Sequence, residues 1–286
     1  MNAVSTYRDI LNSVSATFAR SETPFLDACL LLAHYLGLSK ESLLTRLSEL
    51  APPLPADFYE SVRRRSDGES IAYILGKKEF YGREFIVDSR VLVPRPDTEI
   101  LVEAALECGD FIEQEHPGRL AVHDACTGSG AVAVSIAVER PDWTVSASDI
   151  SEAALEVARA NATKLLGKTL LLRVSNLLST VQGTFDIITA NPPYVPSQET
   201  DALLRQGWKE PRVALDGGID GLALIPELIN QAYQLLVPGG FLLIETDSLQ
   251  VPAVCAMFEK AGFVAIFIKK DLAGCDRVTG GRKPLV

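Results

Sequence analysis

From residue 119 onward the sequence alternates short apolar runs with helical stretches, and this alternation constrains the fold more than any other feature. Strands are predicted at residues 120–125, 144–148, 170–174, 185–190, 241–246 and 263–269. Such alternation is typical of a mostly parallel sheet with helices on both faces. The stretch after Asp271 is too short for another crossover helix, so "RVTGGRK" is predicted to return as an antiparallel strand beside its predecessor. The sequence therefore predicts an α/β fold.

The first 76 residues are predicted to form a separate helical domain. Apolar residues recur at helical spacing over residues 7–20. The next helix has Thr23 as its N-cap, Pro24 at its first position and Gly37 as its stop. This helix is apolar on nearly all sides, which predicts the central helix of a small bundle. Further helices are predicted after Ser39 and over residues 56–65.

A β-hairpin is predicted between these two regions. In "EFYGREFIVDSRVLV" the apolar residues include Phe80, Phe85 and Val87, with Gly82 at the turn. Two prolines close this segment, and "DTEILVEAALE" starts a helix. The predicted domains are a helical domain at residues 1–76, a hairpin linker at 77–96 and a sheet domain at 97–286.

Charge supports this division and argues against a nucleic-acid-binding protein. The chain has a formal net charge of −10. Residues 1–95 hold 12 basic and 12 acidic side chains, so the whole acidic excess lies in residues 96–286. An acidic sheet domain does not suit a protein that mainly grips a phosphate backbone. We therefore expect no direct binding to nucleic acid.

Cysteines and hydropathy indicate the compartment. The five cysteines are scattered without a C-x-x-C pair, and only three histidines are present. Neither a zinc site nor a disulfide framework is therefore suggested. The sequence has no recognisable signal peptide and no apolar run long enough to span a bilayer. We expect a soluble, cytoplasmic protein with no membrane partner.

A glycine loop, "HDACTGSGAVAVSIA", follows the first predicted strand of the sheet domain and opens a helix. Gly128 and Gly130 allow the backbone to approach a ligand closely. Asp149 lies 21 residues after Gly128 at the end of the next strand, where a carboxylate commonly binds ribose hydroxyls. If the loop is interpreted as G-x-G-x-x-A, ending at Ala133, it matches a loop that binds NAD. As D-x-x-x-G-x-G, starting at Asp124, it resembles the loop that binds S-adenosylmethionine.

A second motif, "ITANPPYVP", ends the fourth strand of the sheet domain. Proline fixes φ and restricts the residue before it, so Pro192 and Pro193 hold Asn191 in a fixed direction. The fourth strand should lie beside the first, which places both motifs at one crevice.

The chemistry of an amide acceptor explains this motif. An amide nitrogen is a poor nucleophile because its lone pair is delocalised. If the Asn191 side-chain carbonyl and the Pro192 backbone carbonyl each accept one N–H, the lone pair can face a sulfonium methyl group. Tyr194 can stack on the planar group. No general base is needed before transfer, because the proton becomes acidic only afterwards.

"NPPY" resembles the acceptor motif of amino methyltransferases that act on glutamine or adenine. The segments "SIAYILGKKEFYGREFIVDSRVLVPRPDTEILVEAAL", "EPRVALDGGIDGL" and "DLAGCDRV" are similar to the release factor glutamine methyltransferase family (PrmC/HemK). The resemblance runs from about residue 65 to the C-terminus. It implies a Rossmann-like class I methyltransferase fold, with a mostly parallel seven-stranded sheet and an antiparallel C-terminal strand.

The resemblance also implies an activity and its residues. The methyl group of S-adenosylmethionine would pass to the glutamine amide of the Gly-Gly-Gln motif in class 1 peptide chain release factors, which the helical domain would recognise. Asn191 and Pro192 would hold the amide, while Pro193 and Tyr194 would shape its pocket. The cofactor would contact Asp124, Cys126, Thr127, Gly128, Ser129, Gly130, Asp149, Ile150, Asn176, Leu177 and Asn191, with Asn176 and Leu177 near the adenine.

Three departures from the family pattern carry expectations of their own. Cys126 replaces a glycine and is expected to keep φ negative; its thiol either has a lowered pKa near the helix N-terminus or is a small buried group. Asn176 replaces an aspartate, which is expected to alter hydrogen bonding to the adenine amino group. "ETDSLQ" lacks the usual glycine and has no functional interpretation from sequence.

Alternative functions remain open at this level. A ribosomal-protein glutamine methyltransferase belongs to a sister family. A DNA adenine methyltransferase would use the same "NPPY" chemistry but would need a basic face and a means of holding a flipped base. A dehydrogenase or a non-catalytic nucleotide-binding module would use only the glycine loop.

Overall fold

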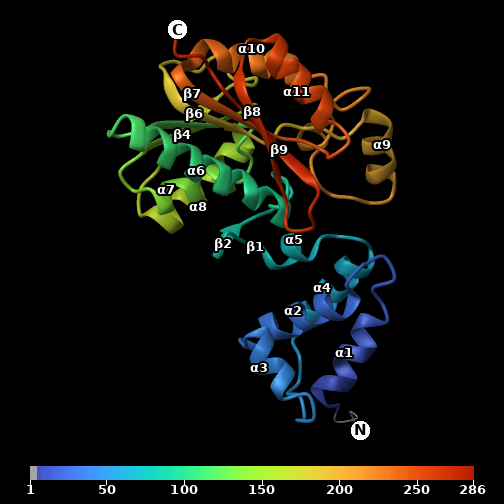
Figure 1. The fold of residues 1–286 in the computed structure, drawn as a ribbon. Coiled ribbons are helices and arrows are strands. Elements are labelled where there is room, and N and C mark those ends of the chain that lie inside the picture. Colours follow the sequence, from blue (N-terminus) through green and yellow to red (C-terminus); the bar gives the residue numbers. More distant parts are fainter. Residues whose placement is uncertain (1–4) are drawn as a thin grey trace. The chain divides into compact units, whose positions relative to one another are not determined.

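The computed structural model describes residues 5–286, which form two compact units (Figure 1). The first unit comprises the chain up to Lys77 together with Leu203–Lys209. The second comprises Lys78–Ala202 and Glu210–Val286. In the part of the chain described, no helix is both long enough and apolar enough to cross a membrane.

The first unit is built around one helix. Its helices are α1 (Tyr7–Ser15), α2 (Pro24–Leu36), α3 (Lys40–Thr45), α4 (Ala56–Ser66) and α5 (Ile71–Leu75). Helix α2 contacts the other four helices, as expected for a helix that is apolar on nearly all sides. Gly37 ends α2 in the left-handed conformation, whereas Thr23 occupies the N-cap without a side-chain hydrogen bond.

Two details of this unit differ from the sequence prediction. Helix α1 ends at Ser15, where Ala16 caps it, rather than at residue 20. Helix α5 was not predicted, because its five residues are too few to show a helical period.

The predicted hairpin consists of β1 (Lys77–Phe80) and β2 (Arg83–Ile86), and from Lys78 onward it belongs to the second unit. Tyr81 and Gly82 have φ angles of +49° and +69°, as a two-residue turn that matches strand twist requires. Phe80 and Phe85 are buried in the core of this unit, with ring centroids 5.9 Å apart. The hairpin is therefore packed into the core of the second unit.

A seven-stranded sheet forms the centre of this unit within the described residues. Its order is β5-β4-β3-β6-β7-β9-β8. The strands β3 to β7 are parallel, and β9 is antiparallel to both β7 and β8. Their bounds are β3 (Ala121–Ala125), β4 (Thr144–Asp149), β5 (Leu171–Val174), β6 (Phe185–Ala190), β7 (Leu236–Glu245), β8 (Val264–Lys270) and β9 (Asp276–Arg282).

The predicted α/β fold and the antiparallel final strand are confirmed. Two details differ from the prediction. Strand β9 pairs with β7 as well as with its predecessor, β8. Strand β7 starts at Leu236, five residues earlier than predicted, because the sequence "VPGG" inside it favours a turn.

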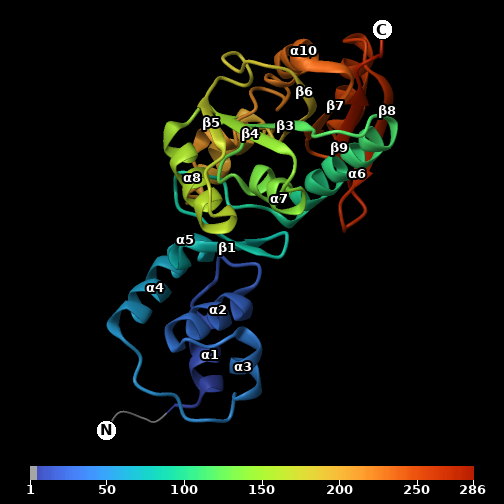
Figure 2. The ribbon, with the colours of Figure 1, turned by 90° about the vertical axis from the view of Figure 1, so that its left-hand side faces the viewer.

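Helices cover both faces of the sheet (Figure 2). The helices α6 (Glu99–Glu115), α7 (Ala131–Glu139) and α8 (Glu152–Leu166) pack on one face, and α10 (Ile225–Leu235) and α11 (Val251–Lys260) on the other. Alternate strand residues enter two cores: Ile187 packs under α6 and α7, whereas Ile188 packs under α10. A 3-10 turn, η1 (Pro96–Thr98), precedes α6; helix α9 (Ser197–Arg205) and the 3-10 turn η2 (Arg212–Ala214) follow β6.

The strand order brings distant segments to one edge of the sheet. Strand β3 lies between β4 and β6, so the chain order reverses there. Ala125 pairs with Ala190, and Ala190 pairs with Ile244. The residues that follow these three strands are therefore neighbours at the carboxyl edge, where open α/β sheets bind ligands. The predicted adjacency of the glycine loop and "NPPY" is confirmed.

Candidate active site

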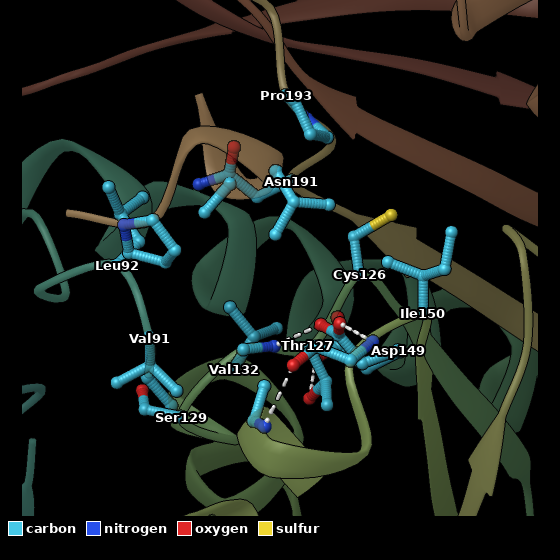
Figure 3. Close-up of a pocket in the computed structure, with 18 of the residues that line it drawn as sticks. Val91, Leu92, Cys126, Thr127, Ser129, Val132, Asp149, Ile150, Asn191 and Pro193 are labelled. Carbon is cyan, nitrogen blue, oxygen red and sulfur yellow. Dashed lines mark hydrogen bonds between the residues drawn. The ribbon is translucent and has the colours of Figure 1, made fainter. Parts of the chain in front are cut away.

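A cavity of about 300 Å³ opens at this carboxyl edge. Figure 3 shows Asn191 and Pro193 on one side of it and Thr127, Ser129 and Asp149 on the other. Most of the predicted site residues line it: Asp124, Cys126, Thr127, Gly128, Ser129, Asp149, Ile150, Asn176, Leu177, Asn191 and Pro193. The lining does not include the described residues Gly130, Pro192 and Tyr194.

The glycine loop places the N-terminus of α7 at the cavity. Gly128 and Gly130 have φ angles of +54° and +79°, which glycine adopts without strain. A Cβ added to Gly130 would lie 3.1 Å from the Cβ of Ala158 on α8. Gly130 therefore lets α7 and α8 pack closely while the loop turns. A helix N-terminus with its unpaired N–H groups favours a ligand that carries hydrogen-bond acceptors.

Asp149 holds this loop at the end of β4. Its Oδ2 accepts from the Gly128 N–H at 2.8 Å, and its Oδ1 accepts from the Ser151 N–H at 2.9 Å. Burial raises the pKa of Asp149, and these backbone hydrogen bonds oppose that rise. Each carboxylate oxygen keeps a second lone pair, so Asp149 can accept further hydrogen bonds from a ligand in the cavity.

Asp124 is more deeply buried than Asp149 and is bonded to two hydroxyls. Its oxygens accept from Thr127 Oγ1 at 2.6 Å and from Thr189 Oγ1 at 2.7 Å. Burial raises the pKa of Asp124 to about 6, although both hydroxyl bonds lower it. Asp124 thus ties the loop to β6 and places a carboxyl group at the cavity wall.

Cys126 contradicts its expected backbone conformation. Its φ angle is +56°, so the expectation of a negative φ was wrong. The chain must turn sharply here, because the Thr127 N–H donates to the Ser148 carbonyl on β4 at 3.0 Å. Burial raises the pKa of the Cys126 thiol, and the nearby carboxyls of Asp149 and Asp124 raise it further. The possibility of a lowered thiol pKa was therefore wrong as well.

Asn191 presents an unpaired carbonyl oxygen. Its Nδ2 donates to Thr98 Oγ1 at 3.2 Å. Within residues 5–286, no group donates a hydrogen bond to Asn191 Oδ1 or to the Pro192 carbonyl oxygen. The two oxygens that the amide chemistry requires are thus not bonded to the described protein.

Tyr194 follows these two residues in the sequence and is anchored through its backbone. Its carbonyl accepts from Gln250 Nε2 at 2.9 Å. Burial raises the pKa of the Tyr194 hydroxyl, and the Glu245 carboxyl contributes to that rise. The side chain is therefore partly enclosed by protein.

The segment "LDGGIDGL" packs directly on the backbone of "NPPY". The Val195 N–H donates to the Leu215 carbonyl at 2.9 Å, and the Gly217 N–H donates back to Val195 at 2.8 Å. A Cβ added to Gly221 would lie 2.1 Å from the Tyr194 carbonyl oxygen. Glycine is needed here because another backbone approaches so closely.

A second pair of segments joins at the cavity wall. Arg95 donates to both carboxylate oxygens of Glu210 at 2.8 Å, and the Val93 N–H donates to the same carboxylate at 3.2 Å. Burial raises the pKa of Glu210, and the Arg95 charge opposes that rise. This ion pair ties the segment before α6 to the segment after α9.

Sequence reasoning missed the lining residues that these two segments supply. They are Arg90, Val91, Leu92, Pro94, Arg95, Thr98, Pro211, Val213, Ala214 and Asp216. The sequence signal was present in "VLVPRPDTE" and "EPRVALDGG", but only as a resemblance without positions. In residues 5–286, no group of three histidine, cysteine, aspartate or glutamate side chains is arranged to hold a metal ion.

The cavity suits S-adenosylmethionine chemically. Asp149 can accept hydrogen bonds from hydroxyls, and Ile150 and Leu177 beside it offer apolar surface for a planar base. Two carboxyl groups, those of Asp124 and Asp149, face a space that would receive a positively charged ligand.

Comparisons with known proteins agree with this geometry. The family described as the PrmC N-terminal domain matches residues 9–76, and the family described as the methyltransferase small domain matches residues 110–209. A methyltransferase structure from Pyrococcus furiosus, 20% identical, has a TM-score of 0.50 over 72% of this chain and 92% of that chain. The predicted Rossmann-like class I methyltransferase fold is thus confirmed.

Two curated relatives match nearly the whole chain. The release factor glutamine methyltransferase of Burkholderia pseudomallei is 41% identical over 267 residues, which are 91% of this chain and 92% of that protein. The release factor glutamine methyltransferase of Neisseria gonorrhoeae is 42% identical over 267 residues, which are 92% of this chain and 94% of that protein. With such identity across both of its units, this chain belongs to the family of release factor glutamine methyltransferases.

Proposed function

We propose that this chain transfers the methyl group of S-adenosylmethionine to the side-chain amide nitrogen of a glutamine, in the Gly-Gly-Gln motif of class 1 peptide chain release factors. The single observation that carries the proposal is the pair of unpaired oxygens, Asn191 Oδ1 and the Pro192 carbonyl, beside a cavity of the nucleotide-binding kind. The names of the relatives support the choice of substrate.

The two oxygens act by orienting the acceptor. Each accepts one N–H of the glutamine amide, which fixes the plane of that amide and directs the nitrogen lone pair into the cavity. They also favour the positive charge that develops on nitrogen during transfer. Alignment of this kind is worth several kcal/mol, up to about 7–11 kcal/mol in ideal intramolecular reactions. The bound cofactor supplies the electrophilic methyl group.

The remaining predicted residues have roles in binding the cofactor. Asp149 accepts from the ribose hydroxyls, and the residues from Cys126 to Gly130 form the loop around the cofactor. Asn176, Ile150 and Leu177 surround the adenine, and Asp124 helps to orient the amino-acid end. Pro193 and Tyr194 shape the acceptor pocket.

The parts of the chain divide the work. Residues 1–76 recognise the release factor, 77–96 link the domains and 97–286 carry the reaction. The protein acts in the cytoplasm, where release factors work. The acidic charge of the catalytic part gives no reason to expect direct binding to nucleic acid.

Asn191→Ala tests the role of the acceptor oxygens. The variant is expected to bind S-adenosylmethionine with a dissociation constant within about twofold of the wild type and to lose at least about 100-fold in kcat, since it removes one oxygen of the orienting pair. Calorimetry and methylation of a purified release factor measure the two quantities.

Asn230→Ala, on the exposed side of α10, is the matched control and should behave as the wild type. Full turnover by Asn191→Ala would remove Asn191 from the mechanism. Mass spectrometry of release factors and ribosomal proteins from the same reactions decides between the two glutamine substrates. Family membership leaves the dehydrogenase and DNA adenine methyltransferase alternatives without support.

A further inference from the structure

Glu245 is a buried carboxyl group behind the acceptor motif. It ends β7 and begins "ETDSLQ", the segment without an interpretation from sequence. The side chain belongs to a residue that is only 1% exposed. Its Oε1 accepts from Thr98 Oγ1 at 3.1 Å, whereas Oε2 has no hydrogen-bond partner among the described residues. A buried carboxyl oxygen without a partner costs stability, so its presence calls for a functional reason.

Two hydrogen bonds link Glu245 to Asn191 through Thr98, and the donor and the acceptor of each bond are fixed. A carboxylate only accepts, so the single hydroxyl proton of Thr98 points toward Glu245. The Thr98 oxygen then faces Asn191 with a lone pair and accepts from Nδ2 at 3.2 Å. Because the nitrogen of the planar amide is held by Thr98, the Oδ1 of the same amide is turned away from it.

We propose that Glu245, acting through the Thr98 hydroxyl, is a positioning residue that keeps the carbonyl oxygen of Asn191 toward the acceptor nitrogen. The inference rests on the proposed role of Asn191. If the Asn191 amide were rotated by half a turn, its NH₂ group would face the NH₂ group of the substrate glutamine. Two hydrogen-bond donors would then face each other. One of the two orienting hydrogen bonds would then be lost.

The charge of Glu245 makes this arrangement depend on pH. Burial raises the pKa of Glu245 to about 7. The Thr98 hydrogen bond and the Arg277 charge lower this pKa, and the Asp97 charge raises it. The Asn191 side-chain amide also approaches Glu245 and lowers its pKa by hydrogen bonding, although no such bond to Oε2 meets the distance and angle limits of a full hydrogen bond. Arg277 on β9 is itself paired with Asp271 at 2.9 Å and with Asp97 at 3.4 Å.

Tyr194 lies near enough to Glu245 to feel its charge, together with the charges of Arg277, Arg95 and Asp247. Burial raises the pKa of the Tyr194 hydroxyl above its ordinary value, so this group stays neutral as Glu245 titrates. Once protonated, Glu245 can donate to Thr98, and the Thr98 proton is then free to turn toward Asn191 Oδ1. Turnover should therefore rise with pH through neutrality.

Glu245→Gln tests the charge, and Thr98→Val tests the connecting hydroxyl. With saturating S-adenosylmethionine and release factor, both variants are expected to show kcat at least about 10-fold below the wild type at about pH 8. Both should also lose the wild-type rise in kcat between about pH 6 and about pH 8. Their dissociation constants for S-adenosylmethionine should stay within about twofold of the wild type.

Thr98→Ser restores the hydroxyl and should recover most of the turnover that Thr98→Val loses. Glu259→Gln, on the exposed side of α11, is the control for loss of a carboxylate and should match the wild type. If Glu245→Gln does not fold, the Thr98→Ser and Thr98→Val pair decides the question alone.

Two results would overturn the proposal. The first is a kcat within about twofold of the wild type in both Glu245→Gln and Thr98→Val, with the wild-type dependence of kcat on pH kept in both variants. The other is equal loss in Thr98→Ser and Thr98→Val, which would point to a packing role. Failure of the wild type to methylate any release factor would refute the proposed function instead, and the two failures are thus distinguishable.

Discussion

Cys126 holds a backbone conformation that most side chains avoid. A φ angle of +56° places it in the left-handed region, which costs a residue with a Cβ about 1–2 kcal/mol. The turn is needed because the next residue, Thr127, both bonds to β4 through its N–H and reaches Asp124 through its hydroxyl. The geometry of the glycine loop is thus kept at a local cost in stability.

Comparison of Cys126→Gly with Cys126→Ala isolates this cost. Both variants remove the thiol, but only glycine removes the Cβ that is unfavourable at positive φ. Cys126→Gly is expected to be more stable than Cys126→Ala by about 1 kcal/mol. At most positions the alanine variant would be the more stable of the two, because glycine loses more conformational freedom on folding. Urea unfolding measures the difference. Equal stability, or a more stable alanine variant, would show that the turn carries no strain.

At the level of elements, a glycine-rich segment supports the acceptor motif. The loop before α7 follows β3, and the segment after η2 packs on the backbone of Pro193 and Tyr194. A Cβ added to Gly217 would lie 2.7 Å from the Pro193 carbonyl oxygen and 2.8 Å from the Cα of Tyr194, and both are backbone atoms. The position of "NPPY" therefore depends on the backbone of this segment.

Gly221→Ala should displace "NPPY" without changing the cofactor loop. The added methyl group would meet the Tyr194 carbonyl oxygen at 2.1 Å, and the residue also has a φ angle of +76°. We expect a loss of about 2–4 kcal/mol in stability and at least about 10-fold in kcat, with cofactor binding kept. Thermal unfolding, kinetics and calorimetry test this. Gly118→Ala is the control, because a Cβ at that position is sterically tolerated. An unchanged kcat in Gly221→Ala would contradict the role of this segment in supporting "NPPY".

The elements that sequence predicts well are those with local signals. Strands β3, β4 and β6 follow from apolar runs that end at turn residues, and the glycine loop and "NPPY" follow from their order along the chain. The Thr98–Glu245 hydrogen bond joins residues 147 positions apart, and the Arg95–Glu210 pair joins residues 115 apart. No local pattern encodes such pairs, because they form only when the sheet brings the segments together.

Across the whole molecule, stability should depend on pH through one buried histidine. His123 lies in the middle of β3, and its two ring nitrogens face the hydroxyls of Ser146 and Ser148 at 2.9 Å. Burial lowers the pKa of His123 to about 4, and the Arg173 charge lowers it further. The folded protein therefore keeps this imidazole neutral where the unfolded chain would protonate it.

His123→Gln isolates this contribution. Between about pH 6.5 and about pH 4 the unfolded state binds more protons at His123 than the folded state, so stability falls as pH falls. From the difference in pKa, the wild type should lose about 3 kcal/mol more than the variant between about pH 7 and about pH 4. Urea unfolding at several pH values measures this difference in stability. The raised pKa values of Asp124 and Glu245 make the folded state more stable as pH falls, but they do so equally in the wild type and in the variant. Parallel pH curves would contradict the prediction.

The last strand of the chain joins two others that do not touch each other. Strand β9 is hydrogen-bonded to β7 on one side and to β8 on the other, while β8 has no other neighbour in the sheet described. During synthesis β8 is thus made before the only strand that can pair with it. A chain cut short between β8 and β9 would lack the seven residues of β9. Strand β8 and the edge of β7 that pairs with β9 would then both be left unpaired, with a hydrophobic sheet edge open to aggregation.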